Sequence, residues 1–490
     1  MGQLSYPSLQ SHSFEAKMQL TDEQRTIVSH VKANEGLTKI SAVAGSGKTT
    51  LLTAIAKTVP EGTGLYLAYS KAVAVEAQRK FPKWVSCSTT HSLAYQSVFR
   101  PYKLHLGDFS YRAISHKVPF EAKCNIIKHI ESFCLSKYTT FEAYGAEHEL
   151  ASSFIELCKH YLEQMGTGKI GCTHSFYLKL FHVLLSTGLV TFNTFDLVML
   201  DEAGDLNQVT KEIFKLLPAT RKILVGDKYQ NIFTFNETIN CFKELEHEGT
   251  LLPMTQSFRV SDKIASKIEK FCHKYLDPDM HFKGVPVTDE TINSKLYIAR
   301  TNASLITKMM ELNRLAIPYG LVRKAKQIFN LHLTLISLKR GGFVAAPELK
   351  YLQDDVDTYY RDKDLQRSFK SHLDYIKEAH SYDSGLVNTI NSIYRYGTAK
   401  IVSTYEEARK HEKLNQAYML GTSHAVKGLE ADQVELADDM NLAILEIKLA
   451  IDSGKQTIED LTEEQLTEIR LHYVACSRAK SKLINAAHLN

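Results

Sequence analysis

The sequence lacks the features of several protein classes. Its eight cysteines are scattered, with no C-x-x-C pair and no Cys/His cluster at metal-ligand spacing. We therefore expect reduced thiols rather than disulfides, a structural metal or an iron–sulfur cluster. Only 24 glycines and 11 prolines occur in 490 residues, which excludes collagen-like and low-complexity chains. The small excess of basic over acidic residues, 59 to 55, permits nucleic-acid binding without requiring it.

Targeting and membrane signals are also absent. Residues 1–19 contain no basic segment followed by an apolar one, so no signal peptide is expected. The sixth residue is Tyr6 rather than the Ser or Thr that N-myristoylation requires. No stretch approaches the roughly 18 consecutive apolar residues of a membrane-spanning helix. We expect a soluble, cytoplasmic protein that does not contact membranes.

Short apolar runs alternate with helical patterns along most of the chain. Each run is followed by a polar turn and then a helix-like segment, which is typical of parallel strands buried between helices. The sequence therefore predicts an α/β fold with parallel sheets. The predicted strands are residues 37–43, 64–69, 195–200, 222–225, 295–299, 416–421 and 433–436. The alternation lapses at about 99–190 and 303–417, and the first of these segments looks mostly helical.

Charge is unevenly distributed in the second half of the chain. Residues 431–468 carry eleven acidic side chains, which we expect on an exposed helical surface that faces away from any nucleic acid. Residues 314–347 carry six basic side chains and no acidic one, with Tyr319, Phe329 and Phe343 among them. This segment is either a surface that contacts a phosphate backbone or a solvated helical face.

The strongest local motif is AVAGSGKT at residues 42–49, between a predicted strand and a predicted helix. Small residues let backbone N–H groups surround phosphates, and the helix N-terminus adds a favourable dipole. Lys48 is expected to bind the β- and γ-phosphates, and Thr49 to bind Mg²⁺. The expected phosphate-binding set is Ala44, Gly45, Ser46, Gly47, Lys48, Thr49 and Thr50.

Hydrolysis at a bound nucleotide also needs acidic and cationic groups. Asp201 and Glu202 follow the predicted strand 195–200. Asp201 would complete the Mg²⁺ shell, and Glu202 would orient and deprotonate the attacking water. Arg259 and Arg478 are candidates to stabilise charge on the transferred phosphoryl group.

These motifs together resemble the superfamily 1 DNA helicases of the UvrD, Rep and PcrA type, and most closely the F-box DNA helicase branch. The match extends in order from Gln24 to Ala479, nearly the whole chain. Besides the phosphate-binding loop, the matching segments are LTDEQ (20–24), YSKA (69–72), TTHSLAY (89–95), LDEA (200–203), VGDKYQNIF (225–233), TQSFR (255–259), TSHAVKGLE (422–430) and YVACSRA (473–479).

The resemblance implies two RecA-like domains that close on ATP. Gln24 would read the adenine edge, and Phe258 would stack on the base. Gln230 would sense the γ-phosphate, and Glu430 would contact the sugar or couple the two domains. Arg259 and Arg478 would come from the second domain, which makes the implied catalytic set Lys48, Asp201, Glu202, Gln230, Arg259 and Arg478.

Single-stranded DNA is held by a positive groove and by bases that stack on aromatic rings. The stacking candidates near the matched motifs are Tyr69, Phe233 and Phe235, and the backbone contacts are Lys71, Thr90 and His91. Thr422 and His424 complete the expected DNA-binding set. A buried, hydrogen-bonded histidine remains the alternative for His91, and a core position the alternative for Phe233 or Phe235.

The resemblance predicts four parts in the chain. Residues 1–98 and 190–257 would form the first RecA-like domain, and 99–189 a helical insertion in it. Residues 258–302 and 415–490 would form the second RecA-like domain, and 303–414 a reduced insertion. The residues before Leu20 are too few for an F-box, and the chain ends soon after Arg478.

We expect an ATP- and Mg²⁺-dependent DNA helicase or translocase that moves 3′ to 5′ on single-stranded DNA. Its substrates would be tailed or forked duplexes. It would act as a monomer in replication, repair or recombination, with recombinase or replication proteins as partners. We expect it in the cytoplasm of a bacterium or of a phage-infected cell. Gly204 stands where relatives have Gln, and Asn236-Glu237-Thr238 where they have Arg-Gly-Ala. These departures favour one alternative, an ATP-gated clamp on single-stranded DNA; an RNA-directed helicase is the other.

Overall fold

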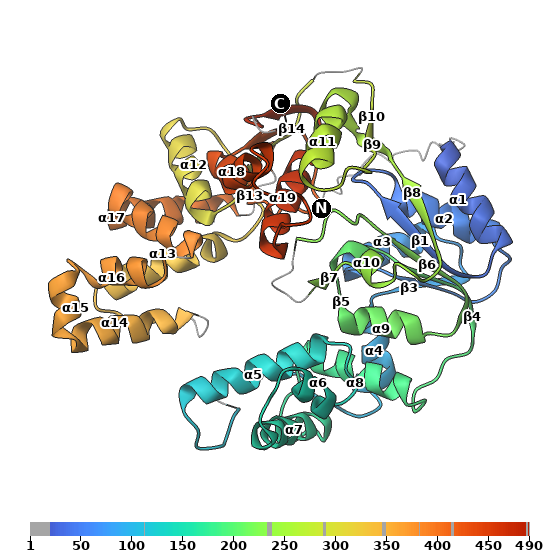
Figure 1. The fold of residues 1–490 in the computed structure, drawn as a ribbon, viewed down its shortest axis with the longest axis horizontal. Helices are drawn as coiled ribbons and strands as arrows, with labels where there is room; N and C mark the ends of the chain where they lie inside the picture. Colours follow the sequence, from blue (N-terminus) through green and yellow to red (C-terminus); the bar gives the residue numbers. More distant parts are fainter. Residues whose placement is uncertain are drawn as a thin grey trace, which may run out of the picture.

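The computed structural model describes residues 20–489 except 112, 233–237, 288–290, 345–348, 382, 413–415 and 487–488. Two parallel sheets covered by helices form its upper and right-hand parts, and two helical groups extend from them (Figure 1). This arrangement confirms the predicted α/β fold. Within the described residues, no helix is long and apolar enough to cross a membrane.

The first sheet is built from β1 (Gly36–Ala42), β2 (Gly64–Leu67), β3 (Val85–Ser88), β4 (Phe195–Leu200), β6 (Ala219–Gly226) and β8 (Thr250–Met254). These six strands run in parallel in the order β3-β2-β4-β6-β1-β8. Helices link them because parallel strands need crossover connections. The helices are α1 (Asp22–Ala33), α2 (Lys48–Thr58), α3 (Lys71–Lys80), α9 (Gln208–Leu216) and α10 (Cys241–Glu244), and β5 (Leu206–Asn207) pairs antiparallel with β7 (Thr238–Ile239).

A first helical group lies below this sheet in Figure 1. It comprises α4 (Thr90–Ala94), α5 (Phe120–Leu135), α6 (Phe141–Glu147), α7 (Ser152–Gly166) and α8 (His174–Ser186). Phe181 of α8 and Val198 of β4 belong to one hydrophobic core. The group is therefore packed firmly on the first sheet rather than joined to it by a linker.

The second sheet is built from β11 (Lys295–Ala299), β12 (Gly320–Leu321), β13 (Tyr418–Thr422), β14 (Ala431–Leu436) and β15 (Ala479–Ile484). These strands are also parallel, in the order β12-β13-β11-β14-β15. A separate parallel pair is formed by β9 (Gln256–Ser261) and β10 (Lys283–Val285). The accompanying helices are α11 (Asp262–Tyr275), α12 (Asn302–Arg314), α18 (Asp438–Asp452) and α19 (Glu463–Cys476).

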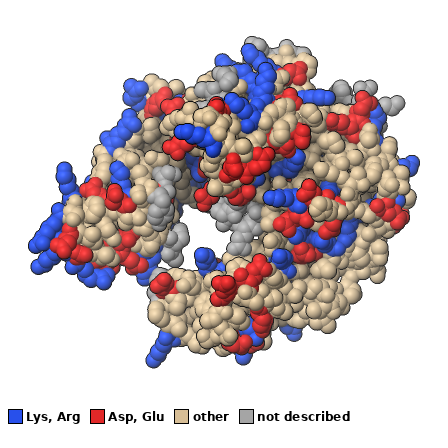
Figure 2. Space-filling view, viewed as in Figure 1, with Lys and Arg blue, Asp and Glu red and all other residues tan. Residues whose placement is uncertain are grey.

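A second helical group occupies the left of Figure 1. It comprises α13 (Ala325–Lys339), α14 (Tyr351–Arg361), α15 (Lys363–Ser368), α16 (His372–Ala379) and α17 (Ser384–His411). A non-helical residue, Gly397, interrupts α17 with φ of 75° and ψ of 156°. Figure 2 shows an opening between the two helical groups, near the centre of the molecule.

All seven predicted strands are confirmed, two with the predicted bounds and five with ends shifted by one to three residues. In the two large sheets the sequence reading missed β3, β8, β12 and β15, which are their four edge strands. It also missed the short pairs β5–β7 and β9–β10. The edge strands β3, β8 and β15 are only partly buried, so they lack the buried pattern on which the prediction depended, whereas β12 is buried but only two residues long. The edge strand β12 lies inside segment 303–414, so this segment supplies part of the second sheet as well as the second helical group.

The basic segment 314–347 differs from its expected form. Tyr319 and Phe329 are fully buried in the core of the second helical group, so they cannot stack on a nucleic-acid base. Phe343 is 82% exposed, and Lys324 and Lys326 are exposed at the start of α13. Only the basic side chains and one ring of this segment remain available to a ligand.

The eight cysteines are all free, and six of them are buried. Burial raises the pKa of the Cys134 and Cys476 thiols, so these groups stay protonated at neutral pH. Six cysteines thus fit the expectation of reduced core thiols, whereas Cys87 is half-buried and Cys124 is exposed.

Candidate functional site

A cavity of about 640 Å³ lies where the phosphate-binding loop meets segments of the second sheet. Its wall includes loop residues Ala44 to Thr50 and, from the other side, Arg259, His424, Lys427, Gly428 and Arg478. All six residues predicted to act in hydrolysis line this one cavity: Lys48, Asp201, Glu202, Gln230, Arg259 and Arg478. Residues more than 400 positions apart in the sequence are therefore brought together.

The phosphate-binding loop connects β1 to α2 through two glycines with positive φ. Gly45 has φ of 74° and Gly47 has φ of 79°, a region that non-glycine residues rarely adopt. A Cβ added at Gly45 would lie 2.5 Å from Cβ of Arg259. Glycine at this position thus permits both the turn and the close approach of β9. We call the part of the molecule that contains β1 to β8 the first half, and the part that contains β9 to β15 the second half.

The loop fits the phosphates of a nucleotide. The N-terminal end of α2 opens at Lys48 with no side-chain cap, so its free N–H groups are available to an anion. Ser46 Oγ is buried and has no hydrogen-bond partner among the described residues. The Thr49 hydroxyl and the Asp201 carboxylate both line the cavity and are suitable oxygen ligands for Mg²⁺. The donor set is therefore compatible with an ATP–Mg²⁺ complex.

Lys48 and Glu202 form an ion pair across the cavity, with Nζ 3.2 Å from Oε1. Burial disfavours the charge on Lys48, but the carboxylates of Glu202, Asp201 and Asp227 outweigh it and raise the Lys48 pKa. Burial works against ionised Glu202 too, yet Lys48 and Lys427 lower its pKa. Both groups are therefore charged at neutral pH, as phosphate binding and base catalysis each require.

The acidic end of β4 is held in an unusual backbone conformation. Glu202 has φ of 56°, in the left-handed region, which costs about 1–3 kcal/mol for a non-glycine residue. The Glu202 N–H donates to Asp201 Oδ1 at 2.8 Å, and Tyr66 donates its hydroxyl hydrogen to Asp201 Oδ2 at 2.7 Å. These bonds fix the orientation of Asp201. Its pKa is raised by burial and by the Glu202 charge, a condition that a bound cation would reverse.

Lys427 links the two halves of the molecule. Its ammonium group forms an ion pair with Asp205 of the segment after β4 and donates to the Gln230 carbonyl at 2.8 Å. The Asp205 side chain is only 3% exposed. Burial lowers the pKa of Lys427 to about 7, against the opposing effect of Glu202. Because an unpaired charge is costly in this buried region, Lys427 and Asp205 each need the other as a partner.

Tyr473 of α19 makes a second link. Its hydroxyl donates to Asp227 Oδ2 at 2.7 Å and accepts from the Ala44 N–H at 3.3 Å. Gln230 Nε2 donates to the same Asp227 oxygen at 2.9 Å. Asp227 is thus shared by a helix of the second half and by the predicted γ-phosphate sensor, and the phosphate-binding loop touches the same network.

The two arginines differ in their surroundings. Arg259 Nε donates to Glu430 at 2.7 Å, and Lys480 also pairs with Glu430 at 2.9 Å. Arg478 is buried and donates to the Val474 carbonyl and the Ser477 hydroxyl, both at 2.9 Å. Burial, together with the nearby Arg259 charge, lowers the Arg478 pKa to about 10. Glu430 therefore forms an ion pair with Arg259 in this structure and does not itself line the cavity.

The predicted base-binding residues lie beside the loop. Gln24 is buried at the start of α1, where it completes a capping box with Thr21, and its Nε2 donates to the Ser46 carbonyl at 3.3 Å. The Phe258 ring is 51% exposed, and its backbone N–H donates to the Gly45 carbonyl at 2.8 Å. An exposed ring next to the loop is available for stacking on a base.

The predicted DNA-binding residues fall into three sets. Tyr69 is 62% exposed but lines the same cavity as Lys48. His91 and Lys71 are exposed and line a shared pocket of about 350 Å³ with Arg100. Thr90 is buried nearby. Thr422 is buried at the end of β13, and His424 lines the same cavity as Lys48, where burial lowers its pKa to about 4. Phe233 and Phe235 lie outside the described residues.

Several residues of this site were missed in the sequence: Tyr66, Asp205, Asp227, Lys427 and Tyr473. Three of them, Asp227, Lys427 and Tyr473, lie in segments that carried the resemblance, which was the available signal. Their partners are distant in sequence, so spacing could not reveal them. Gly204 is explained by packing, since a Cβ added there would lie 2.4 Å from the Asp227 carbonyl oxygen.

Comparison with known proteins agrees with this geometry. A family model described as an AAA domain matches residues 19–266. The chain is 25% identical over 527 residues to F-box DNA helicase protein 1 of Schizosaccharomyces pombe, covering 95% of this chain and 57% of the relative. It is 25% identical over 530 residues to F-box DNA helicase 1 of Gallus gallus, covering 97% and 50%. The chain thus spans about half the length of these curated relatives.

Proposed function

Because the chain belongs to the AAA-domain family and is a superfamily 1 helicase related to the F-box DNA helicase branch, we propose that it couples ATP hydrolysis to movement along single-stranded DNA. The observation that carries this proposal is the single cavity lined by residues from both halves of the molecule. A site divided between two bodies makes nucleotide binding depend on their closure, which is the requirement for stepping.

In the proposed reaction, the γ-phosphate replaces Glu202 as the partner of Lys48. The released Glu202 carboxylate then orients the attacking water and accepts its proton. Arg259 and Arg478 stabilise charge on the transferred phosphoryl group from the second half. A Mg²⁺ ion held by Thr49 and Asp201 would neutralise charge on the β- and γ-oxygens.

Coupling to movement would pass through Lys427 and Tyr473. Lys427 touches Asp205 and the Gln230 carbonyl, and Tyr473 touches Asp227 and the loop N–H of Ala44. A change at the γ-phosphate sensed by Gln230 therefore reaches the second half by direct contacts. These links support the helicase over the clamp, since they would provide coupling despite Gly204; the other departure, at Asn236 and Glu237, lies outside the described residues.

The proposed DNA track begins at the pocket lined by Lys71, His91 and Arg100, and the exposed Tyr69 ring lines a second small pocket that also includes His91. Cations and rings of this kind hold single strands through phosphates and bases. The opening between the two helical groups (Figure 2) gives the strand a place to pass. The reported relatives are from fission yeast and chicken, so they give no support to a bacterial or phage origin.

The 3′ to 5′ direction is tested by strand displacement on duplexes that carry either a 3′ or a 5′ single-stranded tail. We expect ATP-dependent unwinding of the 3′-tailed duplex only. Unwinding of the 5′-tailed duplex would overturn the direction, and ATP hydrolysis without displacement of either strand would favour the clamp. Equal stimulation of hydrolysis by RNA and DNA of matched sequence would favour the RNA-directed alternative.

A further inference from the structure

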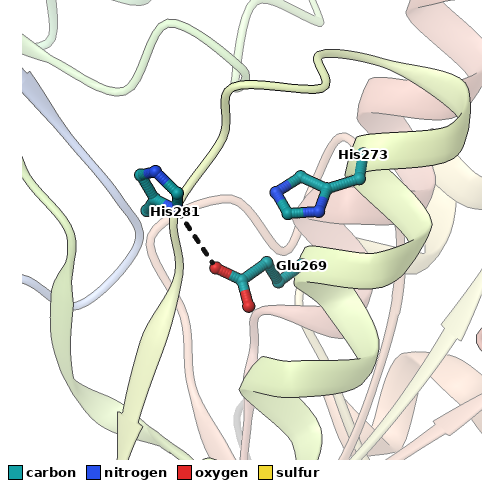
Figure 3. A group of neighbouring side chains, drawn as sticks. All are labelled: Glu269, His273 and His281. Carbon is teal, nitrogen blue, oxygen red and sulfur yellow. Dashed lines mark ion pairs between the residues drawn. The ribbon is translucent and has the colours of Figure 1, made fainter.

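A group of potential metal ligands lies on the second half of the molecule, outside the nucleotide cavity (Figure 3). Glu269 and His273 are one turn apart on α11, and His281 follows in the connection to β10. One ligand atom from each residue lies within 4.8 Å of the other two. Spacing of four residues places Glu269 and His273 on the same face of the helix.

Backbone contacts hold two of these side chains in position. Glu269 Oε1 accepts a hydrogen bond from the Phe282 N–H at 3.0 Å. The His273 ring is hydrogen-bonded through Nε2 to the Met280 carbonyl. His281 is freer, because its side chain is 67% exposed, and its Nδ1 lies 3.6 Å from Glu269 Oε1. The group therefore has two anchored members and one that can rotate toward them.

We propose that Glu269, His273 and His281 bind a divalent transition metal of the zinc type. Two imidazoles and one carboxylate are a known zinc ligand set, and imidazole favours zinc over Mg²⁺. Tetrahedral zinc with bonds of about 2.0–2.1 Å places its ligand atoms about 3.3 Å apart. Rotation of the exposed His281 and a small shift of the other two side chains give this spacing, and solvent supplies the fourth ligand.

The metal would clamp the end of α11 to the connection that leads into β10. That connection contains Asp277, whose Oδ2 accepts from Lys228 Nζ and from the Tyr229 hydroxyl, each at 2.8 Å. Lys228 and Tyr229 belong to the matched segment that includes Gln230. The site would thus stiffen the part of the second half that contacts Lys228 and Tyr229, the residues just before the predicted γ-phosphate sensor Gln230.

The test uses the full chain after chelator treatment and dialysis, with zinc alone as the probe. We expect one Zn²⁺ per chain by competition with a chromogenic chelator, with affinity in the micromolar range or tighter and undiminished by millimolar Mg²⁺. His273→Gln and His281→Gln should each weaken binding by more than about 100-fold, since even the loss of an outer-shell partner costs 10–100-fold. The matched control is His247→Gln, which removes an exposed histidine elsewhere and should not change binding.

A second measurement keeps the proposal falsifiable if a variant is unstable. Zinc should raise the thermal unfolding midpoint of the wild type and of the control, because a ligand of the folded state stabilises it, but not that of His281→Gln. Cobalt(II) substituted for zinc should give visible absorption bands that the variants lack. Zinc binding that is absent, or unchanged in His273→Gln and His281→Gln, would overturn the proposal. None of these readouts depends on ATP or DNA.

Discussion

A buried ion pair joins the two halves of the molecule at the nucleotide cavity. The Asp205 side chain is only 3% exposed, and its carboxylate pairs with Lys427 from the other half. Removing one partner of a buried ion pair leaves a charge without compensation, whereas removing both leaves none. Substitution of one partner should therefore lower the free energy of unfolding much more than substitution of both.

Lys427→Met should lower the free energy of unfolding by about 3–5 kcal/mol, because Asp205 would remain buried without its partner. Asp205→Asn combined with Lys427→Met should recover much of that loss. The measurement is a double-mutant cycle from urea unfolding curves. Purely additive effects of the two substitutions would show that the pair makes no specific contribution.

Gly204→Ala should destabilise the protein by about 1–3 kcal/mol, as overpacking in a close-packed interior does. An added Cβ would lie 2.4 Å from the Asp227 carbonyl oxygen, which is backbone and cannot rotate away. Gly166→Ala is the matched control, since its Cβ would meet only the Phe176 ring at 3.7 Å. Equal unfolding midpoints for the two variants would contradict this explanation of Gly204.

At the scale of helices and strands, the sequence was most informative where burial is complete. The loop AVAGSGKT lies between β1 and α2 as expected, and Asp201 and Glu202 follow β4. The edge strand Ala479–Ile484 was missed because it mixes lysine and serine with its apolar residues, and β12 because it has only two residues. The group of Glu269, His273 and His281 was missed because His281 lies outside α11 and comes close to it only where the chain turns back toward β10. Tertiary contacts of this kind leave no periodic signal in one sequence.

The helix α19 should owe its position against the phosphate-binding loop partly to the Tyr473 hydroxyl. Tyr473→Phe removes its bonds to Asp227 and to the Ala44 N–H, and leaves both buried polar groups short of a partner. We expect a loss of about 1–3 kcal/mol in the free energy of unfolding, together with weaker ATP binding. Tyr66→Phe provides a comparison, because it removes a hydroxyl contact to Asp201 within the first half. Wild-type ATP affinity in Tyr473→Phe would argue against a role for this link in the site.

Over the whole molecule, two sheets carry the nucleotide site and two helical groups flank an opening (Figure 2). The predicted basic surface on the second helical group is reduced by the burial of Tyr319 and Phe329, but Lys324 and Lys326 remain exposed. Contacts to phosphate from such lysines release counterions and so depend on salt. Salt dependence therefore reports on whether this group contacts DNA.

Lys324→Glu combined with Lys326→Glu should weaken single-stranded DNA binding and lower the slope of log affinity against log salt by about 2, roughly one unit for each lost contact. Lys263→Glu with Lys270→Glu, on the exposed side of α11, serves as a charge-matched control. Fluorescence anisotropy at several salt concentrations measures both. Identical slopes for the two double variants would place the DNA elsewhere.

The most direct test of the account is steady-state ATP hydrolysis with and without single-stranded DNA, for the wild type, Lys48→Ala and Lys57→Ala. Lys57 lies on the same helix as Lys48 but is exposed, so its removal controls for loss of a lysine from α2. The account predicts strong stimulation by DNA in the wild type and Lys57→Ala, and no hydrolysis in Lys48→Ala. Hydrolysis that DNA does not stimulate, or that survives Lys48→Ala, would contradict it.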